Sequence, residues 1–374
     1  MAGEEYQGDI LLQEGKISAM GLQIAAPEGA LVLEAEGCMI LPGFIDAHCH
    51  VGLEEEIYRI EGDDCNEMTE PITPEMRALD GIHPEDEGLR DARLGGVTAV
   101  YTGPGSGNVI GGTGVVMKTY GKVVDQMVIR EPAGLKIALG ENPKAVYGEQ
   151  KKMPMTRMGT AALLRQALVD AETYREKLSL GDSDPDKLPE RDLGMEAIAK
   201  VLEKEIPLRA HAHRSDDIMT AIRIAREFQA DLVIEHCTEG HKLAAELAQA
   251  GYPAVVGPSL TNRAKVELKD KTFKTPGVLA QHGVKVAIMT DHPVIPLEQL
   301  PLCAALAVKA GMPEEEALKA ITINAAEILA VDQRIGSLEV GKDADLVVWS
   351  EHPFGMTARP LLVLIDGKVV HPEE

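Results

Sequence analysis

The middle of the chain alternates short apolar runs with stretches that carry the spacing of helices. Runs rich in Val, Ile and Leu occur at residues 44–46, 97–101, 115–118, 135–139, 207–210, 231–234, 254–256 and 284–289. Helices are expected at residues 84–95, 159–178, 193–205, 215–229, 240–250, 297–310 and 313–330. Parallel strands that are covered on both faces require continuous apolar runs of this kind. Eight such units predict an α/β fold, a (β/α)8 barrel of the TIM type. A doubly wound open sheet is the competing fold, but no Gly-x-Gly-x-x-Gly motif follows a strand here.

The two ends of the chain differ from this middle and consist of short strand-like runs with tight turns. Residues 9–21 predict a hairpin, and residues 361–370 predict a second one. Strand-rich ends around one long α/β middle are most simply explained by a small β-sandwich domain built from both termini, with the barrel inserted between them. The expected boundaries are 1–41 and 332–374 for the β domain and 42–331 for the barrel.

Composition excludes several classes of protein. With 37 basic and 60 acidic residues the net charge is −23, and no basic cluster is present, so a nucleic-acid partner is not expected. The sequence contains no apolar run of about 18 residues, so no membrane span is expected. The five cysteines are scattered without a Cys-x-x-Cys pair and no signal peptide is readable, which favours a reducing cytoplasm. We expect a homo-oligomer that acts on a small molecule.

Histidines and one aspartate stand where predicted strands end. They are His48, His50, His211, His213, His236 and Asp291. Residues i and i+2 at a strand end point to the same face. The carboxyl ends of parallel barrel strands all meet on one face, where active sites are built. Imidazole and carboxylate groups gathered there suit Zn²⁺ or a similar borderline metal.

The motifs that contain these residues resemble those of the amidohydrolase superfamily. They are Leu-Pro-Gly-Phe-Ile-Asp-Ala-His-Cys-His at 41–50, His-Ala-His at 211–213, Glu-His at 235–236 and Thr-Asp-His-Pro at 290–293. The segments at 321–326 and 335–349 add to the likeness, which spans nearly the whole chain and is closest to imidazolonepropionase-like and prolidase-like members. The resemblance implies a metal-dependent hydrolase on a distorted (β/α)8 barrel with a β-sandwich from both termini.

The resemblance also implies a ligand set for one or two Zn²⁺ or other divalent ions. The matching positions are His48, His50, His211, His236 and Asp291. In the family the aspartate also takes the proton from the attacking water. Members with two ions usually add a carboxylated lysine at the end of the fourth strand, but Lys136 lies at the start of that strand and is expected to face the wrong end. Glu141, at the correct end, is therefore the expected extra ligand, and Lys118 is a weaker alternative.

Substrate contacts are expected from the loops. The candidates are His213, Asn142, Lys144, Tyr147 and Arg157. Lys144 and Arg157 are cations in acidic surroundings that suit a substrate carboxylate. His213 has two interpretations, contact with substrate or ligands, or a structural role before the next helix.

The expected reaction is hydrolysis of an amide C–N bond, in a cyclic amide or an N-acyl or dipeptide-like acid. A bound metal lowers the pKa of its water to near 7, and Asp291 then serves as general base and general acid. Deamination of a heterocycle is the alternative. Deaminases of the superfamily usually place an acidic residue just after the fifth-strand histidine, where this chain has His213 and Arg214. A non-catalytic assembly protein is disfavoured because such chains normally lose metal ligands.

Overall fold

The computed structural model describes residues 7–56, 59–181 and 184–372, which form an α/β fold with mixed sheets. The largest sheet has six strands in the order β13-β12-β11-β10-β9-β6. They are β6 (Ile110–Thr113), β9 (Leu135–Ala138), β10 (Leu208–Ala212), β11 (Leu232–His236), β12 (Ala254–Val256) and β13 (Val286–Ile288). Strands β9 to β13 run parallel to one another, as expected, and β6 is antiparallel to β9.

A second sheet of four strands has the order β4-β5-β7-β8. Its strands are β4 (Phe44–Cys49), β5 (Val97–Thr102), β7 (Val115–Lys118) and β8 (Val128–Arg130). β4 and β5 are parallel, but β7 is antiparallel to β5, so the prediction of a parallel strand at 115–118 is wrong. A parallel neighbour needs a crossover connection that usually holds a helix. Residues 103–114 contain only a Gly-rich loop and β6.

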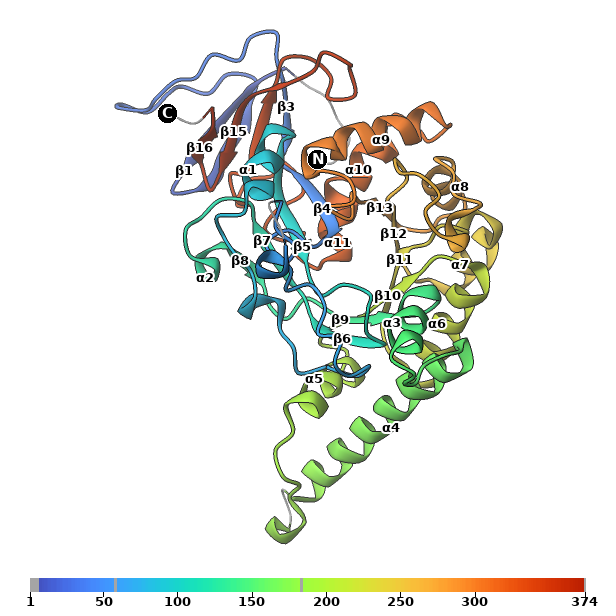
Figure 1. Cartoon of the computed structure of the whole chain (residues 1–374). Coiled ribbons are helices and arrows are strands. Elements are labelled where there is room, and N and C mark those ends of the chain that lie inside the picture. Colours follow the sequence, from blue (N-terminus) through green and yellow to red (C-terminus); the bar gives the residue numbers. More distant parts are fainter. Residues whose placement is uncertain (1–6, 57–58, 182–183, 373–374) are drawn as a thin grey trace.

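The two sheets meet where β4 ends beside the segment that follows β13. The backbone N–H of His50 donates to the carbonyl of His292 over 2.9 Å, and the N–H of Asp291 donates to the carbonyl of His48 over 3.3 Å. Figure 1 shows the strands of both sheets around a common centre with the helices outside them. The carboxyl ends of β4, β10, β11 and β13 therefore come together.

Helices cover the outer faces of the sheets. Their bounds are α1 (Glu87–Leu94), α2 (Val124–Met127), α3 (Glu141–Glu149), α4 (Arg157–Gly181), α5 (Leu193–Leu202), α6 (Ser215–Glu227), α7 (Ala244–Ala250), α8 (Thr275–Gln281), α9 (Leu300–Lys309), α10 (Glu314–Ala320) and α11 (Ile323–Ile328). The single helix predicted at 313–330 is two helices. The break frees the carbonyl of Ile321, which accepts the backbone N–H of Ile45 in β4 over 2.8 Å.

Both ends of the chain contribute to a third sheet, with the order β16-β15-β14-β3. Its strands are β3 (Met39–Pro42), β14 (Leu346–Trp349), β15 (Pro360–Ile365) and β16 (Lys368–His371), and β1 (Asp9–Gln13) pairs separately with β2 (Lys16–Gly21). β3 pairs antiparallel with β14 across more than 300 residues of sequence. Residues 1–6 and 373–374 of the predicted β domain lie outside the described residues.

This third sheet contacts the second sheet through an aromatic pair and an ionic cluster. The rings of Phe44 and Trp349 lie 5.3 Å apart, centre to centre. Lys118 of β7 is buried and donates to the carboxylates of Asp343 (2.9 Å), Asp345 (3.0 Å) and Asp366 (2.5 Å). Among the described helices, none is long and apolar enough to cross a membrane.

Candidate metal centre

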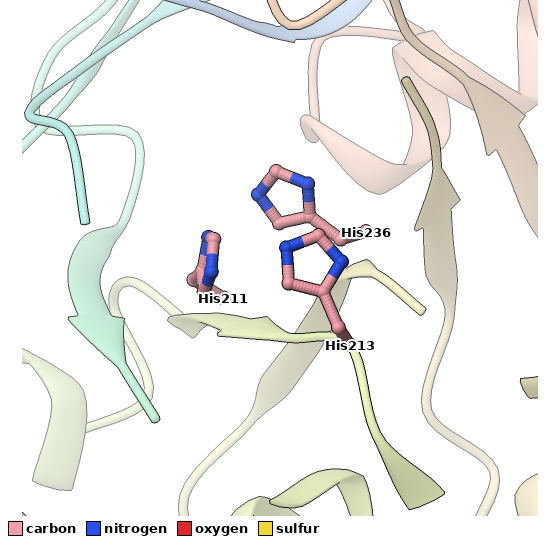
Figure 2. A group of neighbouring side chains, drawn as sticks. All are labelled: His211, His213 and His236. Atoms are coloured by element: carbon pink, nitrogen blue, oxygen red, sulfur yellow. The ribbon is translucent and has the colours of Figure 1, made fainter. Parts of the chain in front are cut away.

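Two groups of potential ligands lie at the carboxyl ends of the strands. His48, His50 and Asp291 form one group, and His211, His213 and His236 form the other. Within each group the ligand atoms lie within 4.8 Å of one another. Figure 2 shows the three imidazoles of the second group turned toward one another, from β10 (His211), the residue that follows it (His213) and the end of β11 (His236).

The two groups adjoin. The rings of His211 and His236 are 4.1 Å apart, centre to centre, and those of His48 and His236 are 5.3 Å apart. The structure therefore brings together all six residues that the sequence placed at strand ends.

Hydrogen bonds hold the Nδ1 atoms of three imidazoles. Nδ1 of His50 bonds to the carbonyl of Gly103 (2.8 Å), Nδ1 of His213 to Oγ1 of Thr238 (2.8 Å), and Nδ1 of His236 to the carbonyl of Gly257 (3.1 Å). A nitrogen held in this way fixes the ring and leaves the other nitrogen available, as metal-binding histidines require.

Several nitrogens have no hydrogen-bond partner among the described residues, although they are buried. Among the histidines of the two groups they are both nitrogens of His211, Nε2 of His213 and Nδ1 of His48. A buried polar group without a partner costs about 1–3 kcal/mol. A metal ion bound by the nitrogens of His211 and His213 would remove that cost there, so the residues present fit such an ion.

The protonation states of three of the histidines and of Asp291 also suit a metal, whereas at His50 burial is outweighed by Cys65 and Asp291, which raise its pKa well above the usual range. Burial holds the pKa of His211, His213 and His236 well below the usual range, and neighbouring positive groups add to this. Burial alone would raise the pKa of Asp291, but the contacts from His48 (3.2 Å) and His50 (3.4 Å) outweigh it and lower that pKa. Neutral imidazoles and an ionised carboxylate are the forms that bind metal.

Backbone strain marks the same strand ends. His236 (φ 66°), Cys237 (φ 49°) and Asp291 (φ 58°) adopt the left-handed conformation that residues with a side chain rarely take. Such strain costs about 1–3 kcal/mol per residue and clusters at functional sites. Asp46 supports the neighbouring backbone, because its carboxylate accepts from the N–H of His48 (3.0 Å) and the N–H of Thr290 (2.9 Å).

Glu235 lies directly beneath the histidines and was not singled out from the sequence. It is fully buried and contacts Nζ of Lys136 (2.6 Å), Nε of Arg209 (2.7 Å) and Nδ1 of His48 (2.9 Å). Arg209 in turn donates to the carbonyl of Ala47 (2.7 Å). A charged residue in the middle of an apolar strand was the available signal.

Lys136 is close to the site, so the prediction that it faces the opposite end is wrong. Its Nζ lies 3.5 Å from Nε2 of His48, and the residue is 1% exposed. β9 has only four residues, and the long lysine side chain spans the distance from the start of the strand to the histidines.

Glu141 belongs to neither group of potential ligands. It is the first residue of α3, and its backbone N–H donates to Oε2 of Glu267 over 3.1 Å. Glu267 instead approaches the histidines, with Oε1 3.6 Å from Nε2 of His213 and 4.0 Å from Nε2 of His211. Glu267 lies in the long loop before α8, and nothing in the sequence distinguishes it from other loop carboxylates.

The remaining substrate candidates have partners of differing kinds. Asn142 bonds to Ser106 and Lys265, and Nε of Arg157 pairs with Asp217 over 2.9 Å. The hydroxyl of Tyr147 donates to a backbone carbonyl, that of Glu70. Lys144 is half-buried and has no hydrogen bond or ion pair within the part of the chain that the structure describes. Lys118 is held by three aspartates at the third sheet, away from the histidines.

Comparison with known proteins agrees with this arrangement. Residues 39–370 match the amidohydrolase family. A solved structure of an amidohydrolase from Thermotoga maritima MSB8 is 49% identical, with a TM-score of 0.95 over 98% of this chain and 95% of that one.

Two curated relatives are similar along almost the whole chain. Imidazolonepropionase from Idiomarina loihiensis is 26% identical over 97% of this chain and 91% of its own length. Amidohydrolase tasK from Hapsidospora irregularis is 30% identical over 97% of this chain, which spans 40% of that relative's length. On this evidence, together with the histidines and aspartate at the strand ends, the chain belongs to the amidohydrolase family and is a hydrolytic enzyme.

Proposed function

We propose that the protein cleaves an amide C–N bond in a cyclic amide or an N-acyl or dipeptide-like acid, with Zn²⁺ or a similar divalent ion at the histidine–aspartate centre. The observation that carries this proposal is the convergence of His211 and His236 with His48, His50 and Asp291, which includes buried nitrogens without protein partners. We assign these five residues as ligands.

The ion, when bound, lowers the pKa of its water to near 7 and polarises the substrate carbonyl. Asp291 is held ionised, so it can accept the proton of the attacking water. The same carboxyl then delivers that proton to the leaving nitrogen, which would otherwise depart as a poorly stabilised amide anion. His213 adjoins the ligands, and we assign it a role in orienting them or the substrate.

For the extra ligand of a site with two ions we favour Lys136 over Glu141. Nζ of Lys136 is 3.5 Å from a ligand nitrogen, whereas Glu141 is in neither ligand group. A lysine binds metal through a carbamate, and carboxylation of Lys136 would supply one. Lys136→Met is expected to lower the metal content of the purified protein, and Glu141→Gln to leave it unchanged. The reverse result would restore Glu141.

One observation keeps deamination as a second candidate. Arg214, at the place where deaminases carry an acid, pairs with Asp216. However, Glu267, from the loop before α8, brings a carboxylate to within 3.6 Å of Nε2 of His213, and this carboxylate is the candidate for the role of the missing acidic residue.

The test combines metal analysis with a substrate panel. We expect bound zinc in the purified protein, loss of that zinc in His211→Asn, and its retention in the exposed control His282→Asn. A panel of N-acyl amino acids, dipeptides, cyclic amides and amino-heterocycles is then followed for ring opening, for amine and carboxylate products, and for ammonia. Hydrolysis of an amide without ammonia supports the proposal. Ammonia from a heterocycle would replace it by deamination, and a protein unable to bind zinc would overturn both.

We further infer that the six-stranded sheet and the sheet β4-β5-β7-β8 correspond to a distorted (β/α)8 barrel at residues 42–331. Residues 1–41 and 332–374 are proposed to form the separate β domain, supported by the pairing of β3 with β14. A homo-oligomer and a cytoplasmic location stay predictions from the sequence.

A further inference from the structure

A small pocket opens beside His236, on the side toward the loop between β12 and α8. Its volume is about 10 Å³, room for one water molecule or one carboxylate oxygen. Its polar lining includes Ser259, Lys271, Thr272 and Thr275 together with His236 itself. A ligand group in this pocket would therefore lie next to the metal centre.

The loop that forms this pocket is basic, in a chain whose net charge is −23. Its cations are Arg263, Lys265, Lys269, Lys271 and Lys274, against the acidic residues Glu267 and Asp270. Both acidic residues are already paired, Glu267 with Lys265 (3.3 Å) and Asp270 with Lys242 (2.6 Å). The remaining cations of the loop are left without a carboxylate from the loop itself.

Lys271, the cation that lines the pocket, has no carboxylate partner within the described residues. Its Nζ donates to the carbonyl of Thr261, to Oγ1 of Thr261 (2.5 Å) and to the carbonyl of Asn262 (3.1 Å), all neutral groups. Partial burial of the ammonium lowers its pKa, and the neighbouring Arg263 lowers it further. Neutral groups hold the lysine in place, and its charge stays uncompensated.

Arg263 reinforces this charge in the same way. It donates to the carbonyls of Lys269 (2.9 Å) and Lys271 (3.3 Å), so its guanidinium also has no carboxylate partner in the described part of the chain. Most other lysines near the site pair with an acid, as Lys136 does with Glu235 and Lys265 does with Glu267. Two uncompensated cations beside a substrate pocket attract an anion and raise its local concentration.

We propose that the pocket formed by Lys271, Ser259 and Thr272, with Arg263 behind it, binds an anionic group of the substrate, a carboxylate. This inference rests on the proposed function and narrows it, because it selects acids such as N-acyl amino acids, dipeptides or cyclic amides with a free carboxylate over neutral amides. The alternative interpretation is that Lys271 has only a structural role and fixes the loop through its hydrogen bonds to Thr261 and Asn262.

The experiment uses probes that bind through the metal and differ only in the distal group. The monohydroxamates of succinic, glutaric and adipic acid are compared with butyro-, valero- and hexanohydroxamate, in which a methyl group replaces the carboxylate. Dissociation constants are measured by calorimetry on the zinc-loaded full chain. The three N–H groups of Lys271 are already donated within the loop, so the lysine acts on the acid through its charge, and the hydroxyls of Ser259 and Thr272 supply the hydrogen bond. A hydrogen bond to a charged group contributes about 1.5–3 kcal/mol, so at the chain length that reaches the pocket we expect about ten-fold or tighter binding of the acid.

Variants distinguish a role of Lys271 in binding the carboxylate from a purely structural role in the loop. Lys271→Met is expected to remove the preference for the acid and Lys271→Arg to retain most of it. Lys269→Met, an exposed lysine of the same loop that does not line the pocket, is expected to leave it unchanged. The metal content and affinity for the methyl probes check that each variant is folded.

Equal affinities for acid and methyl probes at every chain length would overturn the anion site and leave the metal centre standing. The same holds if Lys271→Met keeps the preference, or if Lys269→Met loses it equally. Failure of every hydroxamate to bind, together with absence of zinc, would overturn the proposed function itself and this inference with it.

Discussion

At the scale of single residues, most side chains of the candidate metal centre are oriented by the partner of their other nitrogen or oxygen atom. Spacing in the sequence was sufficient to predict that His48, His50, His211, His236 and Asp291 lie together, because strand ends in parallel sheets meet by geometry. Glu235 was overlooked although a charged residue in an apolar strand was a signal, and Glu267 carried no signal because it approaches the histidines from a distant loop. Spacing misplaced Lys136 because position along a strand does not state how far a four-carbon side chain extends.

Asp291→Asn is expected to lower kcat by about 10²- to 10⁴-fold, the usual contribution of a general acid–base group. The amide cannot accept the proton of the water. The rate of hydrolysis of whichever panel substrate is turned over provides the measurement, with metal content determined on the same sample. A variant that keeps its metal and most of its kcat would exclude Asp291 as the base.

Glu235→Gln is expected to destabilise the fold by about 3–5 kcal/mol, the cost of leaving buried charges without their partner. Lys136 and Arg209 would lose the carboxylate that both contact. Metal affinity should also fall by about 10- to 100-fold, because His48 loses its orienting contact. Urea unfolding and zinc competition with a chelator report the two effects. Glu227→Gln, which removes only an exposed pair with Arg165, should change neither.

At the scale of elements, the positions of most strands and helices followed from the apolar runs, but the direction of β7 did not. The direction of β7 depends on the length and content of the connection before it. The break between α10 and α11 depends on a bond from Ile321 to a strand far away in sequence. Residues 141–149 begin with Asn142-Pro143 directly after a strand and were not predicted as helix α3. A proline in the first turn is compatible with a helix, because its missing N–H is not needed there.

Gly112 in β6 allows the long segment between β4 and α1 to pack closely against the sheet. It has φ 114°, and a Cβ at this position would lie 2.3 Å from the backbone carbonyl oxygen of Met76. Gly112→Ala is therefore expected to destabilise the protein by more than 1 kcal/mol, from backbone strain of about 1–2 kcal/mol and the added clash.

Gly148 in α3 is the matched control, because a Cβ there meets nothing within 4 Å. Gly148→Ala should stabilise by about 0.5–1 kcal/mol through the helix propensity of alanine. Urea midpoints of the two variants should move in opposite directions. Equal shifts of the two urea midpoints would show that the segment between β4 and α1 is not packed against β6 at Gly112.

At the scale of the whole molecule, the third sheet and the second sheet are joined by the buried ammonium of Lys118 and the carboxylates around it. The high acidic content of the chain includes these aspartates, so part of the net charge belongs to an internal contact. No pattern in the sequence pairs a lysine at 118 with aspartates more than 200 residues later. A sheet shared by strands from both ends of the chain was nevertheless predictable from the similar pattern of short strand-like runs at the two ends.

Lys118→Met is expected to destabilise the protein by about 3–5 kcal/mol, because the buried carboxylate of Asp345 is left without its cation, whereas Asp343 keeps Arg334 and Lys16. Metal content should not change, since Lys118 is at the third sheet. Lys122→Met, an exposed lysine four residues later, is the control and should leave the unfolding midpoint in place. Loss of zinc in the Lys118 variant would instead return this lysine to the list of ligands.

The pairing of β3 with β14 also sets an order of events during synthesis. β3 is synthesised more than 300 residues before its partner β14 and the two strands beyond it. Until then the apolar strand Met39–Pro42 has no sheet to join, while the parallel strands next to it can already form. Contacts between such distant segments fold slowly. A nascent chain stalled before residue 346 would therefore expose this strand, and chaperones that recognise short apolar segments would find it there.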